Sequence, residues 1–351
     1  MGRDVLSVRQ MMVLLVVGLL APAADLLPTV AARQVGRGGW LVVLGALPLL
    51  LLAVWACGKV FSGRGPCAAV GKPVGYTIII MYLIWVLFGL AVVLRLSAAR
   101  LEIVYSKVPP FLFAAALAAL AAWMGMGKVS ALARAAEVFY LALSVVLAGV
   151  LLLALFNVEW KNLWPVEWER LPSGSIRAAG ILLTAAPAAV MGAHVPKGAR
   201  SARSICGWVT AFCLVVTLVL AAVLGSVGSG LSAHLDIPYL IMVQGLGVKG
   251  AFQRTEALIA AVWLLSDLVF AGVLLRSWRE YAAQLVPEKW CRRSVPAAAA
   301  AALAGGWLLF PQESGAQLFC QTVLSVAGVV LGLMIPTLLW LMSLVRSKRN
   351  G

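Results

Sequence analysis

Long runs of hydrophobic residues dominate the pattern along the chain. The clearest runs, at 74–94, 138–158, 205–230 and 318–345, contain no charged residue. A helix needs roughly 20 apolar residues to cross the hydrocarbon core of a bilayer, which is about 30 Å thick. Each of these four runs is therefore long enough to form a membrane-spanning helix.

Weaker hydrophobic runs raise the number of predicted spans to ten. The ten spans lie near residues 10–30, 39–57, 74–94, 108–126, 135–157, 178–195, 205–227, 255–275, 295–311 and 318–345. The sequence thus predicts an all-α polytopic membrane protein that forms a single domain over residues 1–351. The Ala-rich run 297–310 is the weakest, and a re-entrant segment is its alternative interpretation.

Composition excludes a soluble fold. Of the 351 residues, 63% are hydrophobic and only 12% are charged, and the mean hydropathy is +1.00. Soluble domains carry roughly 45–50% apolar and about 25% charged residues. A globule of this composition could not cover its core with polar surface.

The net charge of +15 concerns the loops rather than the spans. In a soluble protein such an excess suggests nucleic acid, whereas here it indicates loops that lie against anionic lipid headgroups. Most of the Lys and Arg residues fall on one side when both termini are placed in the cytoplasm. The segment from Arg3 to Ala23 also resembles a secretory signal, and we favour an uncleaved first helix over that interpretation.

Four acidic residues fall within the predicted spans: Asp25, Glu137, Glu256 and Asp267. An ionised carboxylate near the bilayer centre costs roughly 2.5–3.5 kcal/mol on insertion scales. All 28 Lys and Arg residues can be drawn outside the spans, so we expect none of them to neutralise Asp267. Asp267 is then protonated, holds a cation together with Asp25 and Ser266, or pairs with a basic residue of another subunit.

Prolines interrupt the first and sixth predicted spans. Pro22 removes a backbone donor next to Asp25, and Pro187 does the same in the sixth span. If residues 10–157 and 178–345 are two repeats of five helices, the interrupted spans occupy equivalent positions, as in inverted-repeat transporters with a midplane site. Two simple proline kinks are the other interpretation. The predicted ligand-binding residues are Pro22, Ala23, Asp25, Pro187 and Ala188.

Signs of enzyme chemistry are lacking in the sequence. The chain has two histidines, and its six cysteines show no CxxC pair or metal-ligand spacing. It carries no P-loop, dinucleotide fingerprint or nucleophile elbow. We therefore predict a protein that is not an enzyme and that uses no cofactor or metal.

Two polar segments between spans are longer than simple turns. Trp160, Trp164 and Trp168 are spaced four apart in the segment 158–176, which predicts an amphipathic helix on the outer leaflet. A surface that binds a partner is the alternative for this segment. The segment 228–250 is too polar to cross the membrane, and we expect it to cap the extracellular side.

Short motifs in a fixed order give the chain a family resemblance. They are Leu6-Ser7-Val8-Arg9-Gln10, Leu27-Pro28, Gly39-Trp40-Leu41, Asn162-Leu163-Trp164-Pro165-Val166, Pro238-Tyr239, and the most specific one, Phe252-Gln253-Arg254-Thr255-Glu256-Ala257 with Trp263 after it. With these motifs the chain resembles the GerAB-type spore germination permeases, the B subunits of germinant receptors in the amino acid–polyamine–organocation superfamily. Arg254 and Glu256 are interpreted as a structural motif at the start of the eighth span.

The resemblance implies a LeuT-like fold of two inverted five-helix repeats, with a substrate held between broken helices 1 and 6. It also implies a sensor of small germinants, often amino acids, in the spore inner membrane or cell membrane. Its implied partners are a germinant receptor A subunit and a lipoprotein C subunit.

The first span departs from the family pattern at the expected binding site. Family members carry small, glycine-rich residues there, whose free N–H groups can hold a carboxylate. Here Pro22 offers no N–H and Asp25 would repel a carboxylate, so a cationic or neutral ligand becomes an option. Two other functions stay open: a proton- or cation-coupled amino-acid or amine transporter that uses Asp25 and Asp267, and a scaffold subunit with a vestigial pocket.

Overall fold

Helices make up the regular structure of this chain in the computed structural model, which describes residues 4–61, 66–104, 107–196, 198, 201–246 and 255–349. The first half contains α1 (Val8–Val35), η1 (Gly36–Leu41), α2 (Val42–Phe61), α3 (Pro66–Val70), α4 (Lys72–Val104), α5 (Pro110–Met126), α6 (Val129–Leu155) and η2 (Trp160–Asn162). The second half contains α7 (Leu171–Leu182), η3 (Leu183–His194), α8 (Ala202–Val227), α9 (Ser229–Ser232), α10 (Pro238–Gly245), α11 (Thr255–Ala282) and α12 (Glu288–Leu309). The last span is built from α13 (Glu313–Phe319), η5 (Cys320–Leu324), α14 (Ser325–Val329), η6 (Val330–Met334) and α15 (Ile335–Arg349). These described residues contain no β-strand.

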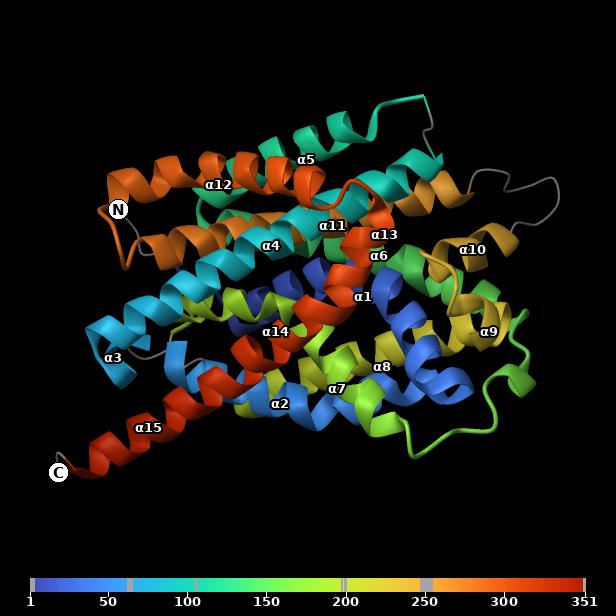
Figure 1. Cartoon of the computed structure of the whole chain (residues 1–351), viewed down its shortest axis with the longest axis horizontal. Coiled ribbons are helices and arrows are strands. Elements are labelled where there is room, and N and C mark those ends of the chain that lie inside the picture. Colours follow the sequence, from blue (N-terminus) through green and yellow to red (C-terminus); the bar gives the residue numbers. More distant parts are fainter. Residues whose placement is uncertain are drawn as a thin grey trace.

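Each predicted span lies on a helix. Seven segments of the described chain are long and apolar enough to cross a membrane, and the first of them, Val8–Phe61, holds two predicted spans. Helix α5 is a shorter apolar helix, and α12 covers the weakest predicted span as one continuous helix. Figure 1 shows the helices of these spans packed side by side in one bundle. The ten-span count and the five-plus-five repeat stay predictions.

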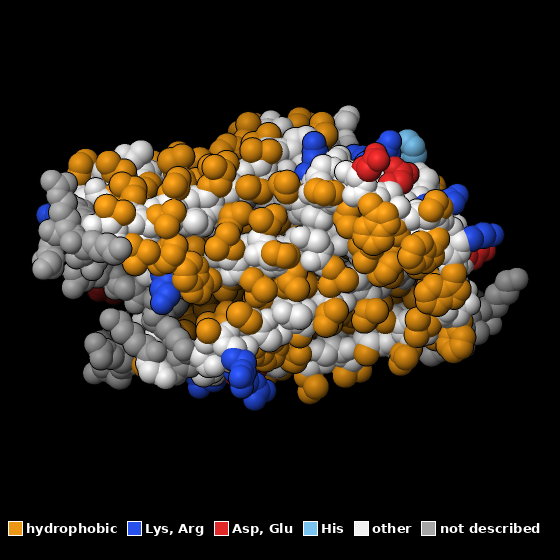
Figure 2. All heavy atoms as spheres, turned by 90° about the horizontal axis from the view of Figure 1, so that it is seen from below, with side chains coloured by type: hydrophobic (Ala, Val, Ile, Leu, Met, Phe, Trp, Pro, Cys, Tyr) orange, Lys and Arg blue, Asp and Glu red, His pale blue; other side chains and the backbone are white. Residues whose placement is uncertain are grey.

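Helix α1 lies in the centre of the bundle, where it packs against α6, α7, α8 and α11 (Figure 1). Most of its side chains are buried, with Leu14, Ala21 and Leu27 fully inaccessible, as expected of a helix that is hydrophobic on most of its surface. Helix α6 lies at the periphery and exposes Val138 and Leu141. Figure 2 shows hydrophobic side chains over most of one face of the molecule, the surface that lipid would cover.

The prediction of a broken first helix is wrong in its simple form. The α-helix α1 begins with a capping box between Ser7 and Gln10, continues through Pro22 and Pro28, and ends at Gly36. Gly36 has φ of 66°, a conformation that glycine adopts without strain.

The sixth predicted span does change conformation. The α-helix α7 ends at Leu182 and continues as the 3₁₀ helix η3, which contains Pro187. A 3₁₀ stretch this long is uncommon, because its hydrogen-bond geometry is poorer than that of an α-helix.

The last predicted span contains two π-helical turns, η5 and η6, which the sequence pattern did not indicate. Between them, α14 meets α7 at backbone contact. A Cβ added at Gly180 would lie 1.9 Å from the carbonyl oxygen of Ser325, and one added at Gly328 would lie 2.0 Å from the carbonyl oxygen of Gly180. Only glycine fits at this crossing.

The loop predictions have mixed outcomes. The predicted amphipathic helix over 158–176 is wrong: only the three-residue η2 and the start of α7 are helical there. Its three tryptophans are exposed. The segment 228–246 forms the short helices α9 and α10. Arg254 and the side chain of Glu256 lie outside the described residues.

Candidate functional site

Asp25 and Asp267 share one guanidinium group, that of Arg100. The Nη1 atom of Arg100 donates to Oδ2 of Asp267 at 2.7 Å, and Nη2 donates to Oδ2 of Asp25. The three side chains come from α1, α4 and α11, and each is no more than 5% exposed. We call Asp25, Arg100 and Asp267 the charged triad.

The expectation that no Lys or Arg within the spans neutralises Asp267 is wrong. Helix α4 continues to Val104, ten residues beyond the predicted end of that span, and carries Arg95 and Arg100 into the protein interior. Arg95 donates to the carbonyl oxygens of Phe310 and Pro311. Buried cations persist when carboxylates or carbonyls satisfy them, and both arginines meet this condition.

The charged triad contains two acidic groups and one basic group. With all three groups ionised, two carboxylates and one guanidinium carry a net charge of −1. Removing one partner of a buried ion pair typically costs about 3–5 kcal/mol, because the remaining charge is left uncompensated. The triad therefore joins three helices that are far apart in the sequence, and its excess of carboxylates over cations favours a proton or a cationic group nearby.

Unpartnered polar atoms surround Asp25. Arg100 Nε and the Tyr239 hydroxyl are buried and have no hydrogen-bond partner among the described residues, and the Trp263 indole N–H lies within hydrogen-bonding reach of the Asp25 carboxylate. The Tyr239 and Trp263 rings are stacked with centroids 5.1 Å apart, and both side chains lie within electrostatic reach of Asp25. Since buried polar groups are normally hydrogen-bonded, this cluster has the capacity to bind a polar molecule.

A small cavity adjoins the triad. Its volume is about 20 Å³, and its lining includes Pro22, Asp25, Arg100, Thr184 and Asp267. A water molecule needs roughly 10–15 Å³ of such space. The cavity thus has room for about one water, and a larger ligand requires the surrounding helices to separate.

Ser266 serves a different contact from the one predicted. Its hydroxyl accepts a hydrogen bond from Ala21 N at 3.0 Å and donates one to Val17 O at 2.5 Å. These two groups are four residues apart, the pair that the α-helical ladder would join. A side chain inserted into the ladder and a proline are both recognised causes of helix kinks. Ser266 therefore bridges the backbone of α1 in the turn before Pro22, and α1 remains one helix.

The other predicted ligand-binding residues are not all brought together. Ala23, Pro187 and Ala188 are buried, but the small cavity is lined from η3 by Thr184 instead. Sequence reasoning missed Arg100 and Thr184 as site residues. It noted Tyr239 and Trp263 only as parts of family motifs. In the part of the chain that is described, no cluster of three or more His, Cys, Asp or Glu residues could hold a metal ion.

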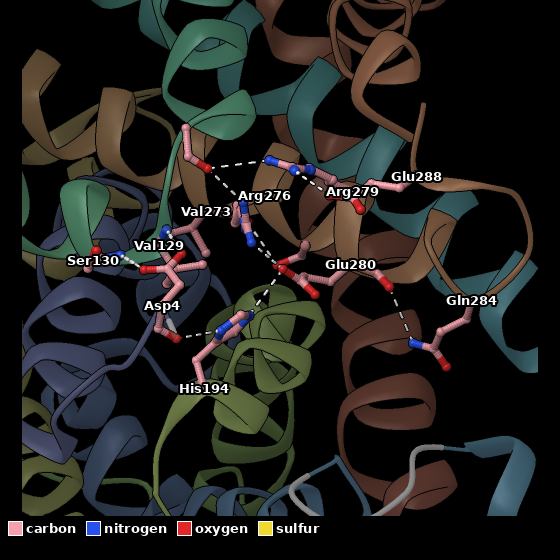
Figure 3. A network of polar contacts seen from close by, with 12 residues as sticks. Asp4, Val129, Ser130, His194, Val273, Arg276, Arg279, Glu280, Gln284 and Glu288 are labelled. Carbon is pink, nitrogen blue, oxygen red and sulfur yellow. Dashed lines mark hydrogen bonds and ion pairs between the residues drawn. The ribbon is translucent and has the colours of Figure 1, made fainter. Parts of the chain in front are cut away.

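A second polar cluster, which we call the end network, lies where α6 begins and η3 ends (Figure 3). The Asp4 carboxylate accepts hydrogen bonds from the N–H groups of Val129 at 2.7 Å and Ser130 at 3.1 Å. The ring of His194 contacts the Asp4 carbonyl through Nδ1 at 3.0 Å and Glu280 Oε1 through Nε2 at 3.1 Å. The segment before α1 is thus tied to α6, η3 and α11.

Two arginines of α11 extend the end network. Arg276 donates to Glu280 and, at 2.7 Å, to the Gly127 carbonyl. Arg279 donates to the Met126 carbonyl at 2.8 Å and forms an ion pair with Glu288 at 3.6 Å. Figure 3 shows these side chains converging from α11 toward the α5–α6 connection.

The pKa of Asp4 reflects its place in the end network. Burial raises this pKa, but hydrogen bonds from Ser130 and Val129 and the charge of Arg276 lower it by more, so the net pKa lies below the usual 3.8. Asp4 is therefore ionised near neutral pH.

Comparisons with known proteins bear on the fold and the family. The crystal structure of MhsT in complex with L-phenylalanine is similar to this chain, with a TM-score of 0.66 and 14% sequence identity over 98% of this chain and 96% of that one. At this identity the likeness shows a shared LeuT-like transporter fold. No curated protein gives a significant match. A family model described as "Spore germination protein" matches residues 5–280, more than three quarters of the chain, and the chain therefore belongs to the spore germination permease family.

Proposed function

We propose that this permease is the B-type subunit of a germinant receptor, which binds a small molecule at the charged triad and signals its occupancy to partner subunits. The observation that carries the proposal is a buried Asp25–Arg100–Asp267 triad with unpartnered polar atoms beside a cavity between α1, α4, η3 and α11. Intramembrane ionisable residues that face a cavity typically mark functional sites.

The charges favour a ligand that carries an ammonium group. Asp25 belongs to a cluster of two carboxylates and one guanidinium, and Arg100 Nε is a buried donor without a partner among the described residues. An amino acid would pair its ammonium group with Asp25 and its carboxylate with Arg100 Nε. The similar structure MhsT binds L-phenylalanine, which supports an amino acid or a related amine here.

Signalling requires surfaces for the A subunit and the lipoprotein C subunit. Trp160, Trp164 and Trp168 are 54–69% exposed on the connection between α6 and α7. Exposed tryptophans are common anchors of protein interfaces, so we propose this connection as a docking surface on the predicted outer side of the membrane.

A second candidate function is a proton- or cation-coupled secondary transporter of amino acids or amines. The same triad supports it, because a site with net charge −1 between three helices can take up a coupling ion. In a transporter, binding to Asp25 and Asp267 would alternate with opening on the two sides of the membrane.

Two measurements test these functions. Thermal unfolding of the purified protein with amino acids, amines, nucleosides and sugars should reveal a ligand, because binding to the native state stabilises it by roughly 2.7 kcal/mol at 100 times Kd. Gradient-driven uptake in proteoliposomes that vanishes in Asp267→Asn would favour the transporter. A ligand that stabilises the protein without any uptake supports the receptor, and no stabilisation by any compound contradicts both.

A further inference from the structure

A larger cavity, separate from the charged triad, opens between α1, α2, η3 and α8. Its volume is about 200 Å³, and every residue that lines it is apolar or glycine, including Met12, Leu50, Ala189, Trp208 and Phe212. An apolar cavity of roughly 150 Å³ stays free of water and takes up a benzene-sized molecule. This cavity therefore suits a segment of hydrocarbon chain and offers nothing to a polar ligand.

The cavity lies within membrane-spanning segments and is partly open to the outside of the bundle. Its walls come from the first half of α1, from Val8 to Leu19, and from the start of α8, from Ile205 to Phe212. Hydrocarbon in a bilayer reaches such an opening directly, whereas a water-soluble molecule would have to cross lipid first. Position and lining together favour a lipid acyl chain as the occupant.

Three cations flank one end of this cavity. Arg9 follows the lining residue Val8, Lys59 follows the lining residue Gly58, and Arg203 lies at the start of α8, two residues before the first lining residue of that helix. All three are exposed, and none forms an ion pair with another described residue. They lie where α1 and α8 begin and α2 ends, the predicted cytoplasmic end of these helices.

We propose that this cavity binds an acyl chain of an anionic phospholipid whose phosphate is held by Arg9, Lys59 and Arg203. Basic residues beside a cleft between membrane helices on the cytoplasmic side fit the headgroup of such a lipid, and the apolar lining fits its chain. The inference rests on the cavity and the cations and does not depend on the ligand proposed for the triad.

The bound acyl chain would pack against the turn of α1 that Ser266 contacts. Leu15, Val16 and Leu19 line the cavity and alternate with Val17 and Ala21, whose backbone groups are bridged by Ser266. An acyl chain in the cavity would resist inward movement of the turn of α1 that Ser266 bridges. The lipid thus acts as a structural ligand for the same helix that carries Asp25.

Native mass spectrometry with added phosphatidylglycerol and phosphatidylcholine tests the charge requirement. We expect phosphatidylglycerol to be retained preferentially and each change, Arg9→Gln, Lys59→Gln or Arg203→Gln, to weaken its binding about fivefold, which corresponds to about 1 kcal/mol per cation. Lys107→Gln, a change of an exposed cation beyond the C-terminal end of α4, should leave binding unchanged. Equal retention of both lipids, or equal effects of all four variants, would overturn the proposal.

Quenching of Trp208 by brominated acyl chains locates the lipid. In nanodiscs with brominated phosphatidylglycerol, we expect Trp208→Phe to remove a quenched component of the fluorescence. Gly192→Leu fills the cavity from η3, where a side chain meets open space, and should protect Trp208. Gly149→Leu is the matched control, since it too projects into open space, on α6 away from the cavity.

Two results would refute the location. One is that brominated phosphatidylglycerol quenches the fluorescence of wild type and of Trp208→Phe to the same extent. The other is equal protection of Trp208 by Gly192→Leu and Gly149→Leu. Occupation by a peptide segment of a partner would appear as protection of Trp208 by the partner with no dependence on phosphatidylglycerol, and it would also contradict the proposal.

Discussion

The charged triad and the end network are both polar clusters that tie several helices together, but they do so in opposite ways. The triad depends on one cation, Arg100, which contacts two carboxylates that are no more than 5% exposed. In the end network, Glu280 has two partners, His194 and Arg276, and Arg276 also holds a backbone carbonyl. One region has no substitute for its central group, whereas the other shares its contacts among several groups.

The difference follows from solvation. In the triad each charge is removed from water, so water cannot replace a partner that a substitution removes. The loss of folding free energy is then large. In the end network, His194 and Glu280 keep about a fifth of their side-chain surface accessible, and water can replace a lost contact. We therefore expect single substitutions to affect the triad far more than the end network.

The largest effect is expected for Arg100→Met. It leaves two buried carboxylates without a cation and should lower the free energy of unfolding by about 3–5 kcal/mol, measured by thermal unfolding in detergent. Arg95→Met is the matched control on the same helix, because Arg95 contacts the Phe310 and Pro311 carbonyls and the Trp307 ring, so its loss strands no charge. Equal destabilisation by both changes would show that the triad has no special role.

A combined variant sharpens this result. Asp25→Asn and Asp267→Asn together with Arg100→Met remove all three charges, and replacement of a whole buried ion cluster is often neutral or stabilising. We expect the combined variant to recover most of the melting temperature that Arg100→Met alone loses. Additive loss in the triple variant would contradict the ionic interpretation.

An intermediate effect is expected for Ser266→Ala. It removes the hydroxyl that serves Val17 O and Ala21 N, and two unsatisfied backbone groups should cost about 1–3 kcal/mol. Ser277→Ala is its control, since Ser277 is equally buried on α11 but bonds only to the Val273 carbonyl of its own helix. If Ser266→Ala lowers the free energy of unfolding by less than Ser277→Ala does, the bridge from Ser266 to α1 is not important for stability.

The smallest effect on stability is expected for Asp4→Ala in the end network, and this effect depends on pH. Because the pKa of Asp4 in the folded protein is lowered below 3.8, its contribution to stability is present above that pH and is lost as the pH falls through the lowered pKa. Asp4→Ala also removes acceptors for the first N–H groups of α6 and should cost about 0.5–2 kcal/mol near neutral pH. The difference in melting temperature between wild type and Asp4→Ala should therefore shrink as the pH is lowered below 3.8. A difference that does not shrink as the pH is lowered would exclude this role for the Asp4 charge.

Hydropathy predicted most of the fold, because membrane crossing is decided by long apolar runs. Each of the ten predicted spans lies on a helix, and the family resemblance is confirmed by the match over residues 5–280. The sequence also predicted part of the irregularity in the first span. Pro22 indicated its position, but the sequence could not show that Ser266 of α11 would bridge this turn while the helix continued.

Arg100 was not predicted as a site residue, because the predicted span 74–94 was ended before the first charged residue that follows it. Leu96, Ala98, Ala99 and Leu101 surround Arg100 with apolar residues that continue the helix, and two acids without a cation nearby called for a buried base. These two observations together indicate a helix that continues past residue 94 and carries a buried arginine. Which of the arginines meets Asp25 and Asp267 depends on the packing of α1, α4 and α11, and a single sequence does not encode such neighbours in any local pattern.

The most direct test of the central claim compares wild type, Asp25→Asn and Asp4→Asn in one thermal-unfolding screen with amino acids, amines, nucleosides and sugars. Ligand binding at the triad predicts that a compound with an ammonium group raises the melting temperature of wild type and of Asp4→Asn, and that this rise is absent in Asp25→Asn. The same rise in all three proteins would contradict binding at the triad.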